Sequence, residues 1–489
     1  MKQIRNSIGK NIFHLFYSTA LSSILNAASL IVLASFISTD DYGKFSVVLA
    51  FAMIMAYLTE AGLNQIVLRE GAKKEASISL IMASFIKLRL GLTLATLMIG
   101  FLLIHWMYAG DTALITLSYA LIFPLVIGIA MQSISITYFQ MLEKMQYSGM
   151  IRMVSAGLLI TVILVGKWFY IDPMIVFFLY GSAYFLAGCF GIFLTTKTLK
   201  LSIRFPFYKG LWKHWGPFLV TGLLFILLPQ IGPIVLEKTL TWKEVGYFAV
   251  AYRIPQALQQ LPFIIAGAFF PVLFRLFQAG DYEQHVKKSI TQVKLMLLAG
   301  MLAAIPFYHL SDFVIGVLFG ERWMEAAFLL KVLALVMVFQ GGSIALGDGL
   351  TTRALQSRRM TVLAVGVASG VMFYAFFSER YGLTGAVVAG VLIEVILLFG
   401  FLICHPDRMV LGKRAVVPYL IYFFITLLGI EVFLSSIPFL AACTQFVLIL
   451  ALAVMDKEWR EKVPALLKKV GLVKESKSKI RKEAHDGAS

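Results

Sequence analysis

Long apolar runs separated by short polar connections dominate this sequence. A helix needs about 20 mostly apolar residues to cross the hydrocarbon core of a bilayer. Fourteen runs meet this requirement, and they fall near residues 12–37, 45–66, 83–107, 113–140, 153–170, 174–196, 214–236, 247–273, 290–310, 326–347, 361–378, 386–404, 416–434 and 439–455. The pattern predicts an all-α polytopic membrane protein with about 14 transmembrane helices.

A short internal repeat in the sequence divides these runs into two halves. Residues 41–47 read DYGKFSV, and residues 244–250 read EVGYFAV. Each segment opens an apolar run after an acidic turn, and the two runs end at Arg69 and Arg275. The internal repeat and the helix count predict two pseudo-symmetric six-helix bundles, and transporter sites tend to lie between such repeats. The predicted organisation is an N-terminal bundle in 1–200, a C-terminal bundle in 201–410, two additional transmembrane helices in 411–455 and a basic tail in 456–489.

The run from residue 245 to residue 275 carries polar residues that an ordinary lipid-facing helix lacks. Arg253, Gln256 and Gln260 follow one another at i, i+3 and i+7, which places them on one helix face. A charge inside a membrane helix costs at least about 2.5 kcal/mol on insertion scales, so it usually faces a protein interior or a wet cavity. The polar stripe indicates the lining of a solute path. A guanidinium there suits an anion, most naturally a phosphate, because it can bind two phosphate oxygens at once.

Each residue of this stripe also has a purely structural interpretation. Arg253 could instead pair with Glu237 or Glu244. Gln256 and Gln260 could hydrogen-bond sugar hydroxyls, or they could join helices through hydrogen bonds worth about 0.6 kcal/mol in membranes.

One more candidate for sugar binding, Gln230, lies in the run 214–236. It sits between Pro229 and Pro233, which interrupt the hydrogen-bond ladder of a helix. The spacing predicts a kink, which could serve as a hinge or be static.

Two carboxylates lie within apolar runs, Glu60 near Asn64 and Glu394 in the sequence VLIEVILLFG. A carboxylate in a membrane can bind and release protons when its surroundings disfavour its charge. Glu60 and Glu394 are therefore candidates for coupling transport to a proton or sodium gradient. The alternative is a structural pair with a neighbouring helix. We expect no metal site and no other cofactor.

The composition agrees with a membrane protein and gives its orientation. Apolar residues make up 60% of the chain, charged residues 14%, and the mean hydropathy is +0.85. The net charge is +17. When each apolar run crosses the membrane once, 35 of the 43 Lys and Arg residues lie on the same side of the membrane as the N-terminus, including those in the connections 67–90 and 141–152. Cytoplasmic connections carry such an excess. The charge therefore predicts cytoplasmic termini and contact with anionic membrane lipids, and no nucleic-acid partner.

Familiar catalytic and metal-binding patterns are missing from the sequence. It has no CxxC, HExxH, Walker or GxSxG motif, and its three cysteines lie in or beside apolar runs. Membrane polymerases and ligases for polysaccharides usually need a sizeable external loop that carries catalytic residues. The connections here are too short for one. These features disfavour an enzyme.

Three blocks of the sequence are similar to one known family. The blocks are TDDYGKFSVVLAFAMIMAYLTEAGLNQIVLRE at 39–70, KEVGYFAVAYRIPQALQQLPFIIAGAFFPVLFR at 243–275 and LFGERWMEAAFLLKVLALVMVF at 318–339. They resemble, in order, blocks of the Wzx-type polysaccharide flippases in the multidrug/oligosaccharidyl-lipid/polysaccharide exporter superfamily. The resemblance covers nearly the whole chain.

The resemblance implies a fold and a function. Two six-helix bundles would form a V around a central cavity, with two extra helices after them. The substrate would be a polyprenyl-diphosphate-linked oligosaccharide, moved from the inner to the outer leaflet of the plasma membrane by alternating access. Polysaccharide assembly machinery would be a partner.

The resemblance also bears on individual residues. In the related lipid II flippases, cavity arginines hold the diphosphate, and Arg253 lies on the eighth helix, where one of them occurs. Those relatives also place arginines on the first helix. This sequence offers only polar residues there, with Asn26 as the candidate contact to sugar.

A cation-coupled multidrug exporter of the same superfamily is the main alternative, and a polysaccharide polymerase or ligase is a weaker one. An exporter of cations would need a cavity dominated by acidic residues. The clearest charge predicted to be buried is instead Arg253, which favours the flippase.

Overall fold

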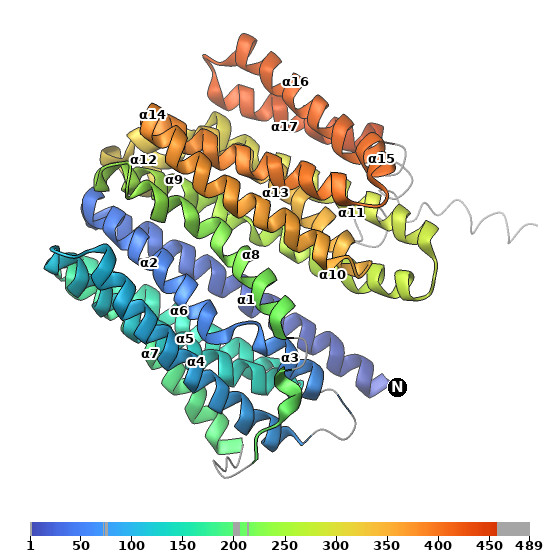
Figure 1. Cartoon of the computed structure of the whole chain (residues 1–489). Coiled ribbons are helices and arrows are strands. Elements are labelled where there is room, and N and C mark those ends of the chain that lie inside the picture. The colour runs from blue at the N-terminus through green and yellow to red at the C-terminus, as the bar shows by residue number, and fades with distance from the viewer. Residues whose placement is uncertain (1, 72, 74–76, 199–205, 213–214, 457–489) are drawn as a thin grey trace, which may run out of the picture.

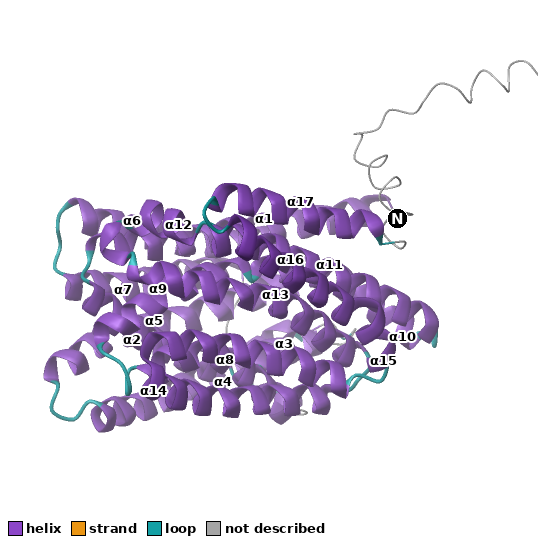
Figure 2. Ribbon diagram, turned by 90° about the horizontal axis from the view of Figure 1, so that it is seen from above, coloured by secondary structure: helices purple, strands orange, loops and turns teal. Residues whose placement is uncertain are grey.

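The computed structural model describes residues 2–71, 73, 77–198, 206–212 and 215–456. Within these ranges all regular secondary structure is helical and no strand occurs, so the prediction of an all-α protein is confirmed. Figures 1 and 2 show the long helices running roughly along one common axis. The basic tail predicted at 456–489 lies outside the described residues from position 457 onward.

The helices fall into two successive sets. The first set comprises α1 (Lys2–Phe36), α2 (Thr39–Glu60), α3 (Leu63–Gly71), α4 (Ile78–Met107), α5 (Thr112–Met141), α6 (Met145–Trp168) and α7 (Pro173–Thr198). The second set comprises the 3₁₀ helix η1 (Lys209–Trp212), α8 (Trp215–Leu236), α9 (Trp242–Leu258), α10 (Gln260–Gln278), α11 (Tyr282–His309), α12 (Ser311–Phe319), η2 (Glu321–Trp323), α13 (Glu325–Thr352) and α14 (Gln356–Cys404). The last part contains α15 (Arg408–Leu411), the π-helical segment η3 (Gly412–Val416), α16 (Val417–Leu434) and α17 (Pro438–Met455).

The number of membrane passes agrees with the sequence pattern. Thirteen helical segments of the described chain are long and apolar enough to cross a membrane. One of them is α14, which has 49 residues and a non-helical backbone at Gly382 (φ 57°, ψ −139°). Such a positive φ suits glycine, and the break there divides α14 into two passes. The described chain therefore makes fourteen passes.

Two membrane helices begin earlier than their apolar runs predict. α4 begins at Ile78 rather than near residue 83, and α6 begins at Met145 rather than near residue 153. Arg152, which precedes its predicted run, therefore lies inside α6, and Arg89, near the start of its predicted run, lies well inside α4. The placement of Arg152 outside a helix is wrong because a polar residue that faces the interior need not end a helix, and both arginines are largely covered by neighbouring helices.

The internal repeat in the sequence corresponds to two helix starts that are built alike. Ser38 caps α2 by accepting a hydrogen bond from the Asp41 N–H at 3.1 Å. Thr241 caps α9 in a full capping box with Glu244. We call the end of the molecule where α2 and α9 begin the cap end. The opposite end, where α3 and α10 finish near Arg69 and Arg275, is the basic end.

The two sets of helices form two halves that meet through a few helices. Figure 1 shows α1 to α7 on one side and α8 to α14 on the other. In the first half α5 packs on α7 and α1 on α6, while in the second half α11 packs on α13 and α13 on α14. The halves contact one another mainly through α2, which crosses α9 and α8. The residue boundaries of the predicted bundles stay a prediction.

α16 and α17 lie outside the second half and are attached to it by polar contacts (Figure 1). The Lys331 ammonium of α13 lies 2.6 Å from a carboxylate oxygen of Glu431 on α16. His309 Nε2 of α11 lies 2.6 Å from Oε1 of Gln445, a buried residue of α17. These contacts fix both extra helices to the bundle beside their apolar packing.

Candidate functional site

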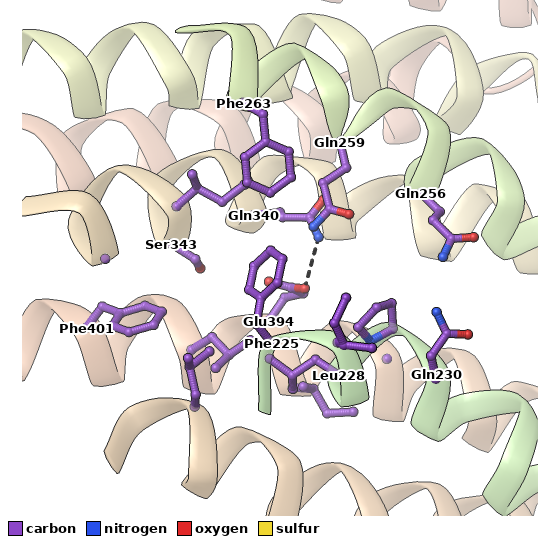
Figure 3. A pocket seen from close by; sticks show the side chains of 18 of the residues that line it. Phe225, Leu228, Gln230, Gln256, Gln259, Phe263, Gln340, Ser343, Glu394 and Phe401 are labelled. Atoms are coloured by element: carbon purple, nitrogen blue, oxygen red, sulfur yellow. Dashed lines mark hydrogen bonds between the residues drawn. The ribbon is translucent and has the colours of Figure 1, made fainter. Parts of the chain in front are cut away.

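A cavity of about 290 Å³ lies within the second half, between α8, α9, α10, α13 and α14. Its polar lining residues are Gln230, Gln256, Gln259, Gln260, Gln340, Ser343, Arg359 and Glu394, together with the hydroxyl-bearing Tyr252 and Tyr374. Figure 3 shows Gln230 and Gln256 opposite one another at one end, with Ser343 and Phe401 toward the other end. A lining of several amides and one carboxylate can bind hydroxyl groups or a cation.

Prolines interrupt the backbone ladder beside this cavity. α8 contains Pro229 and Pro233, as the sequence pattern anticipates. A proline has no N–H, so the carbonyls of Phe225 and Pro229 lack their donors in the helix. Both Phe225 and Pro229 line the cavity. The wall formed by α8 therefore carries carbonyl groups that have no helical partner.

The predicted eighth helix is interrupted where its glutamines lie. α9 ends at Leu258 and α10 begins at Gln260. Gln256 and Gln260, on either side of this interruption, both line the cavity, which brings these two predicted residues and Gln230 together. Arg253, predicted on the same face, is not among the lining residues.

Glu394 is the acidic residue of the cavity lining, and its contacts are few. Its Oε1 accepts a hydrogen bond of 3.3 Å from Nε2 of Gln340 on α13 (Figure 3). Glu394 forms no ion pair with any described residue. Arg359 lines the cavity as well, but its guanidinium lies 3.9 Å from Asp348. The carboxylate therefore has one amide donor and no cation to balance its charge.

Gln340 and Ser343 are cavity residues that the sequence analysis missed. Both lie in the apolar segment VFQGGSIALG of α13, and both are nearly buried. The signal that identifies Gln256, a polar side chain inside a membrane helix, also applies to Gln340. Ser343 gives no such signal, because a serine hydroxyl can be satisfied within its own helix. Here it donates to the Phe339 carbonyl.

Arg253 lies between the two halves. Its Nη1 donates a hydrogen bond of 2.9 Å to Oε1 of Gln256, three residues further along α9. The guanidinium also lies close enough to interact electrostatically with Tyr42 of α2 and with Tyr180 and Tyr184 of α7. Its Nε is buried and has no hydrogen-bond partner in the part of the chain that the structure describes. Arg253 therefore faces tyrosines of the first half with hydrogen-bonding capacity unused.

The acidic partners considered for Arg253 are engaged elsewhere. Glu237 lies 2.6 Å from the Lys238 ammonium and accepts a hydrogen bond of 2.8 Å from the Tyr108 hydroxyl. Glu244 completes the cap of α9. In the part of the chain that the structure describes, Arg253 has no ion pair with an acidic residue. The alternative interpretation, in which Arg253 pairs with Glu237 or Glu244, is therefore wrong.

The other predicted residues lie in the first half, apart from this cavity. Asn26 is half-buried on α1. Glu60 ends α2, where its carboxylate lies 3.7 Å from the Arg89 guanidinium of α4 and accepts a weak hydrogen bond of 3.4 Å from Ser133 of α5. The structure thus separates the two predicted coupling carboxylates, one into each half.

The halves are in close contact at the cap end. Arg322 and the Trp323 indole both donate to the Ala34 carbonyl at the end of α1, at 2.8 and 3.0 Å. The hydrogen bond from Tyr108 to Glu237 joins α4 to the end of α8. Burial beside this carboxylate raises the pKa of Tyr108 well above its usual value, so its hydroxyl remains a donor. These contacts join the two halves at the cap end.

The fold belongs to a known class of membrane transporters. The lipid II flippase MurJ in an inward closed conformation matches over 90% of this chain and 99% of its own, with a TM-score of 0.65 and 14% identity. An inward-facing MATE multidrug transporter of the MOP superfamily matches over 80% of this chain and 95% of its own, with a TM-score of 0.68 and 15% identity. An outward-facing MATE transporter gives a TM-score of 0.59 at 17% identity, over 83% of this chain and 96% of its own. The two-halved helical architecture is therefore confirmed.

The chain belongs to the polysaccharide biosynthesis protein family, whose sequence profile matches residues 8–277, more than half of the 489 residues. A probable low-salt glycan biosynthesis flippase, Agl15 of Haloferax volcanii, is 22% identical over 153 residues. The matched region spans 31% of this chain and 32% of that relative, about a third of its length.

Proposed function

We propose that this protein is a flippase that moves a polyprenyl-diphosphate-linked oligosaccharide from the cytoplasmic to the outer leaflet by alternating access. The observation that carries the proposal is Arg253, which lies between the halves of a polysaccharide biosynthesis protein with no acidic partner among the described residues. A guanidinium so placed suits the phosphate of a lipid-linked sugar. The product would serve cell-surface polysaccharide synthesis, with assembly machinery as a partner.

The glutamines support a role in holding the sugar part of the substrate. Gln230, Gln256 and Gln260 line one cavity, and each amide offers both donors and an acceptor. Sugar hydroxyls need both kinds of partner. Gln256 also accepts from Arg253, so the proposed phosphate contact and the proposed sugar contacts are adjacent. Asn26 on α1 is the proposed sugar contact from the first half.

The contacts at the cap end support alternating access. The halves meet closely there, through the hydrogen bonds of Arg322 and Trp323 to Ala34 and of Tyr108 to Glu237. We assign the cap end to the outside and the basic end to the cytoplasm. The excess of Lys and Arg supports the same orientation, with both termini cytoplasmic in the plasma membrane.

Glu394 is the better placed of the two carboxylates proposed for ion coupling. It lies in the cavity without a cationic partner among the described residues, and a proton or a sodium ion would neutralise it. The carbonyls of Phe225 and Pro229, which lack helical donors, supply further oxygen atoms in the same wall. Glu60, in contrast, already lies beside Arg89.

The multidrug exporter remains the second candidate, because MATE transporters share the fold. A cation exporter would use Glu394 as its counter-ion. Arg253 and the match to the polysaccharide biosynthesis family favour the flippase over the exporter.

The test is a translocation assay in proteoliposomes that contain a polyprenyl-diphosphate-linked oligosaccharide. A membrane-impermeant sugar-modifying reagent reports the fraction exposed outside. Wild type, Arg253→Ala and Arg253→Lys are compared with Arg408→Gln, which removes an exposed guanidinium on α15. We expect translocation by wild type and Arg408→Gln, almost none by Arg253→Ala and partial activity in Arg253→Lys.

Two results would contradict the proposal. If wild type moves no lipid-linked sugar but exports an organic cation, the protein is a drug exporter. If Arg253→Ala flips as fast as wild type, the flippase function stands but Arg253 does not hold the phosphate.

A further inference from the structure

A second group of charged residues lies inside the first half, apart from Arg253 and the cavity. Five helices contribute one residue each: Glu60 of α2, Asn64 of α3, Arg89 of α4, Ser133 of α5 and Arg152 of α6. Asn64 Nδ2 donates to the Ser133 hydroxyl at 2.8 Å, and Ser133 Oγ lies 3.4 Å from Glu60. Arg152 lies within electrostatic reach of Glu60. We call these five residues the Glu60 cluster.

Arg89 is the most unusual member of the Glu60 cluster. Its side chain is 1% exposed, yet none of its three guanidinium nitrogens has a hydrogen-bond partner among the described residues. The closest carboxylate oxygen, on Glu60, is 3.7 Å from Nη1, which is longer than a hydrogen bond. The other arginine, Arg152, also has a buried Nε that no described residue accepts from. Buried charged donors are normally satisfied, so these nitrogens indicate an acceptor that the described part of the chain does not supply.

The charges of the Glu60 cluster do not balance. Two guanidiniums face one carboxylate among the described residues of the cluster, an excess of one positive charge. An unbalanced buried charge is costly, and an anion would offset that cost. Two guanidiniums on separate helices can bind several oxygens of one phosphate group. The chemistry of the cluster therefore suits a phosphate or diphosphate.

Glu60 is the member of the Glu60 cluster that lies nearest the space between the halves. Its side chain is 29% exposed, while Arg89 is covered. Tyr57, one turn earlier on α2, donates a hydrogen bond of 3.2 Å to the Leu219 carbonyl of α8 in the second half. Residues three apart share a helix face, so Glu60 also lies on the side of α2 toward the other half. An anion that enters between the halves would meet Glu60 first.

We infer that the Glu60 cluster is a second phosphate site, in which Glu60 occupies the two arginines until the substrate diphosphate replaces it. The inference rests on the proposed flippase function for the identity of the substrate. Glu60 is then a competitor of the diphosphate, and not merely the structural partner of Arg89. The two roles predict opposite effects when its charge is removed.

The test measures binding of inorganic diphosphate to the purified full-length protein in phosphatidylcholine nanodiscs, by isothermal titration calorimetry. We expect Glu60→Gln to bind diphosphate about tenfold more tightly than wild type, because the competitor has lost its charge. Arg152→Gln should bind at least about tenfold more weakly, with partial recovery in Arg152→Lys. Arg380→Gln, an exposed arginine of α14, is the matched control and should bind like wild type.

The outcomes separate this inference from the proposed function. If Glu60→Gln binds diphosphate no more tightly than wild type, or if Arg152→Gln binds as wild type does, the second site is refuted even where wild type flips lipid-linked sugar. Tighter binding by Glu60→Gln supports the site even where flipping fails. Thermal unfolding of each variant confirms that it is folded.

A lipid arm of the experiment tests the source of the phosphate. Nanodiscs with phosphatidylglycerol present a phosphate in each headgroup. We expect diphosphate binding to persist there. If phosphatidylglycerol at a matched concentration abolishes diphosphate binding, its headgroups occupy the site. That result would assign the site to lipid headgroups and overturn the substrate role.

Discussion

Gly43 of α2 lies directly against the backbone carbonyl of Trp242, the first residue of α9. A Cβ atom at Gly43 would be only 2.0 Å from that oxygen. The relationship is reciprocal, because a Cβ atom at Gly246 would be 2.3 Å from the carbonyl oxygen of Thr39. The two halves therefore cross at the cap end through a pair of glycines in equivalent positions. No larger side chain fits there without moving backbone.

Alanine at either glycine should push the halves apart at the cap end. In Gly43→Ala and Gly246→Ala, the added methyl group meets backbone, which cannot rotate away as a side chain can. Spin labels at the exposed positions Asp40 and Lys243, in a cysteine-free background, report the separation by double electron–electron resonance. We expect a longer or broader distance distribution in both variants. Gly429→Ala on α16, where a Cβ atom meets nothing within 4 Å, is the control and should leave the distribution unchanged.

An acidic residue supplied next to Arg253 should abolish flipping without unfolding the protein. Gln256 Oε1 already accepts from Arg253 at 2.9 Å, so Gln256→Glu places a carboxylate at the same point. The new ion pair would neutralise the guanidinium that we propose for phosphate binding. We expect at least about a tenfold lower translocation rate, or about 1.4 kcal/mol, with an unchanged or higher apparent Tm. Wild-type flipping in this variant would contradict the proposed phosphate contact.

Glu394→Gln should separate flipping from its energy source. The amide preserves the size of the side chain and can still contact Gln340, but it cannot bind and release a proton or balance a sodium ion. We expect the variant to equilibrate lipid-linked sugar between leaflets, while an imposed proton or sodium gradient no longer stimulates it. Glu379→Gln, an exposed carboxylate of the same helix, should respond to the gradient as wild type does. A full gradient response in Glu394→Gln would remove Glu394 from coupling.

His405, in the connection between α14 and α15, should make the protein less stable in mild acid. Its side chain is buried, and burial, together with the charge of Arg353, lowers its pKa from 6.5 to about 3. Between these two values the unfolded chain binds a proton that the folded protein does not. Stability contributed by neutral His405 is therefore complete above about pH 6.5 and falls as the pH decreases, by at most about 1.4 kcal/mol per unit.

The measurement for His405 is the apparent Tm at pH 7.5 and pH 5.0 in detergent. We expect His405→Gln, which cannot be protonated, to show a smaller decrease in Tm over this range than wild type. His105→Gln, an exposed histidine of α4, should decrease as wild type does. Equal decreases in all three proteins would show that His405 does not contribute.

The apolar pattern predicted the number of passes well because span length is a local property of the sequence. It placed the starts of α4 and α6 too late, and it left Arg152 outside a helix although Arg152 lies inside α6. Whether an arginine ends a helix depends on the helices that cover it, and those are far away in the sequence. The same limit explains why the Glu60 cluster was not foreseen.

The candidate cavity was partly predictable for a similar reason. Gln256 and Gln260 share a helix face by spacing alone, and both line the cavity. Arg253 has the same spacing, but it lies one turn nearer the cap end, among tyrosines of the first half. Spacing along one helix gives the direction of a side chain, whereas the packing of other helices decides what it meets there.

The glycine crossing also has a mechanical consequence. Glu60 lies about 25 Å along α2 from Gly43, at 1.5 Å per residue. With the crossing as a fulcrum, a rotation of about 15° would carry the far end of α2 through roughly 6–7 Å. Small angular changes at one membrane face would thus become large displacements at the other. Only two glycines separate the two backbones at this crossing, so the two halves can rotate about it.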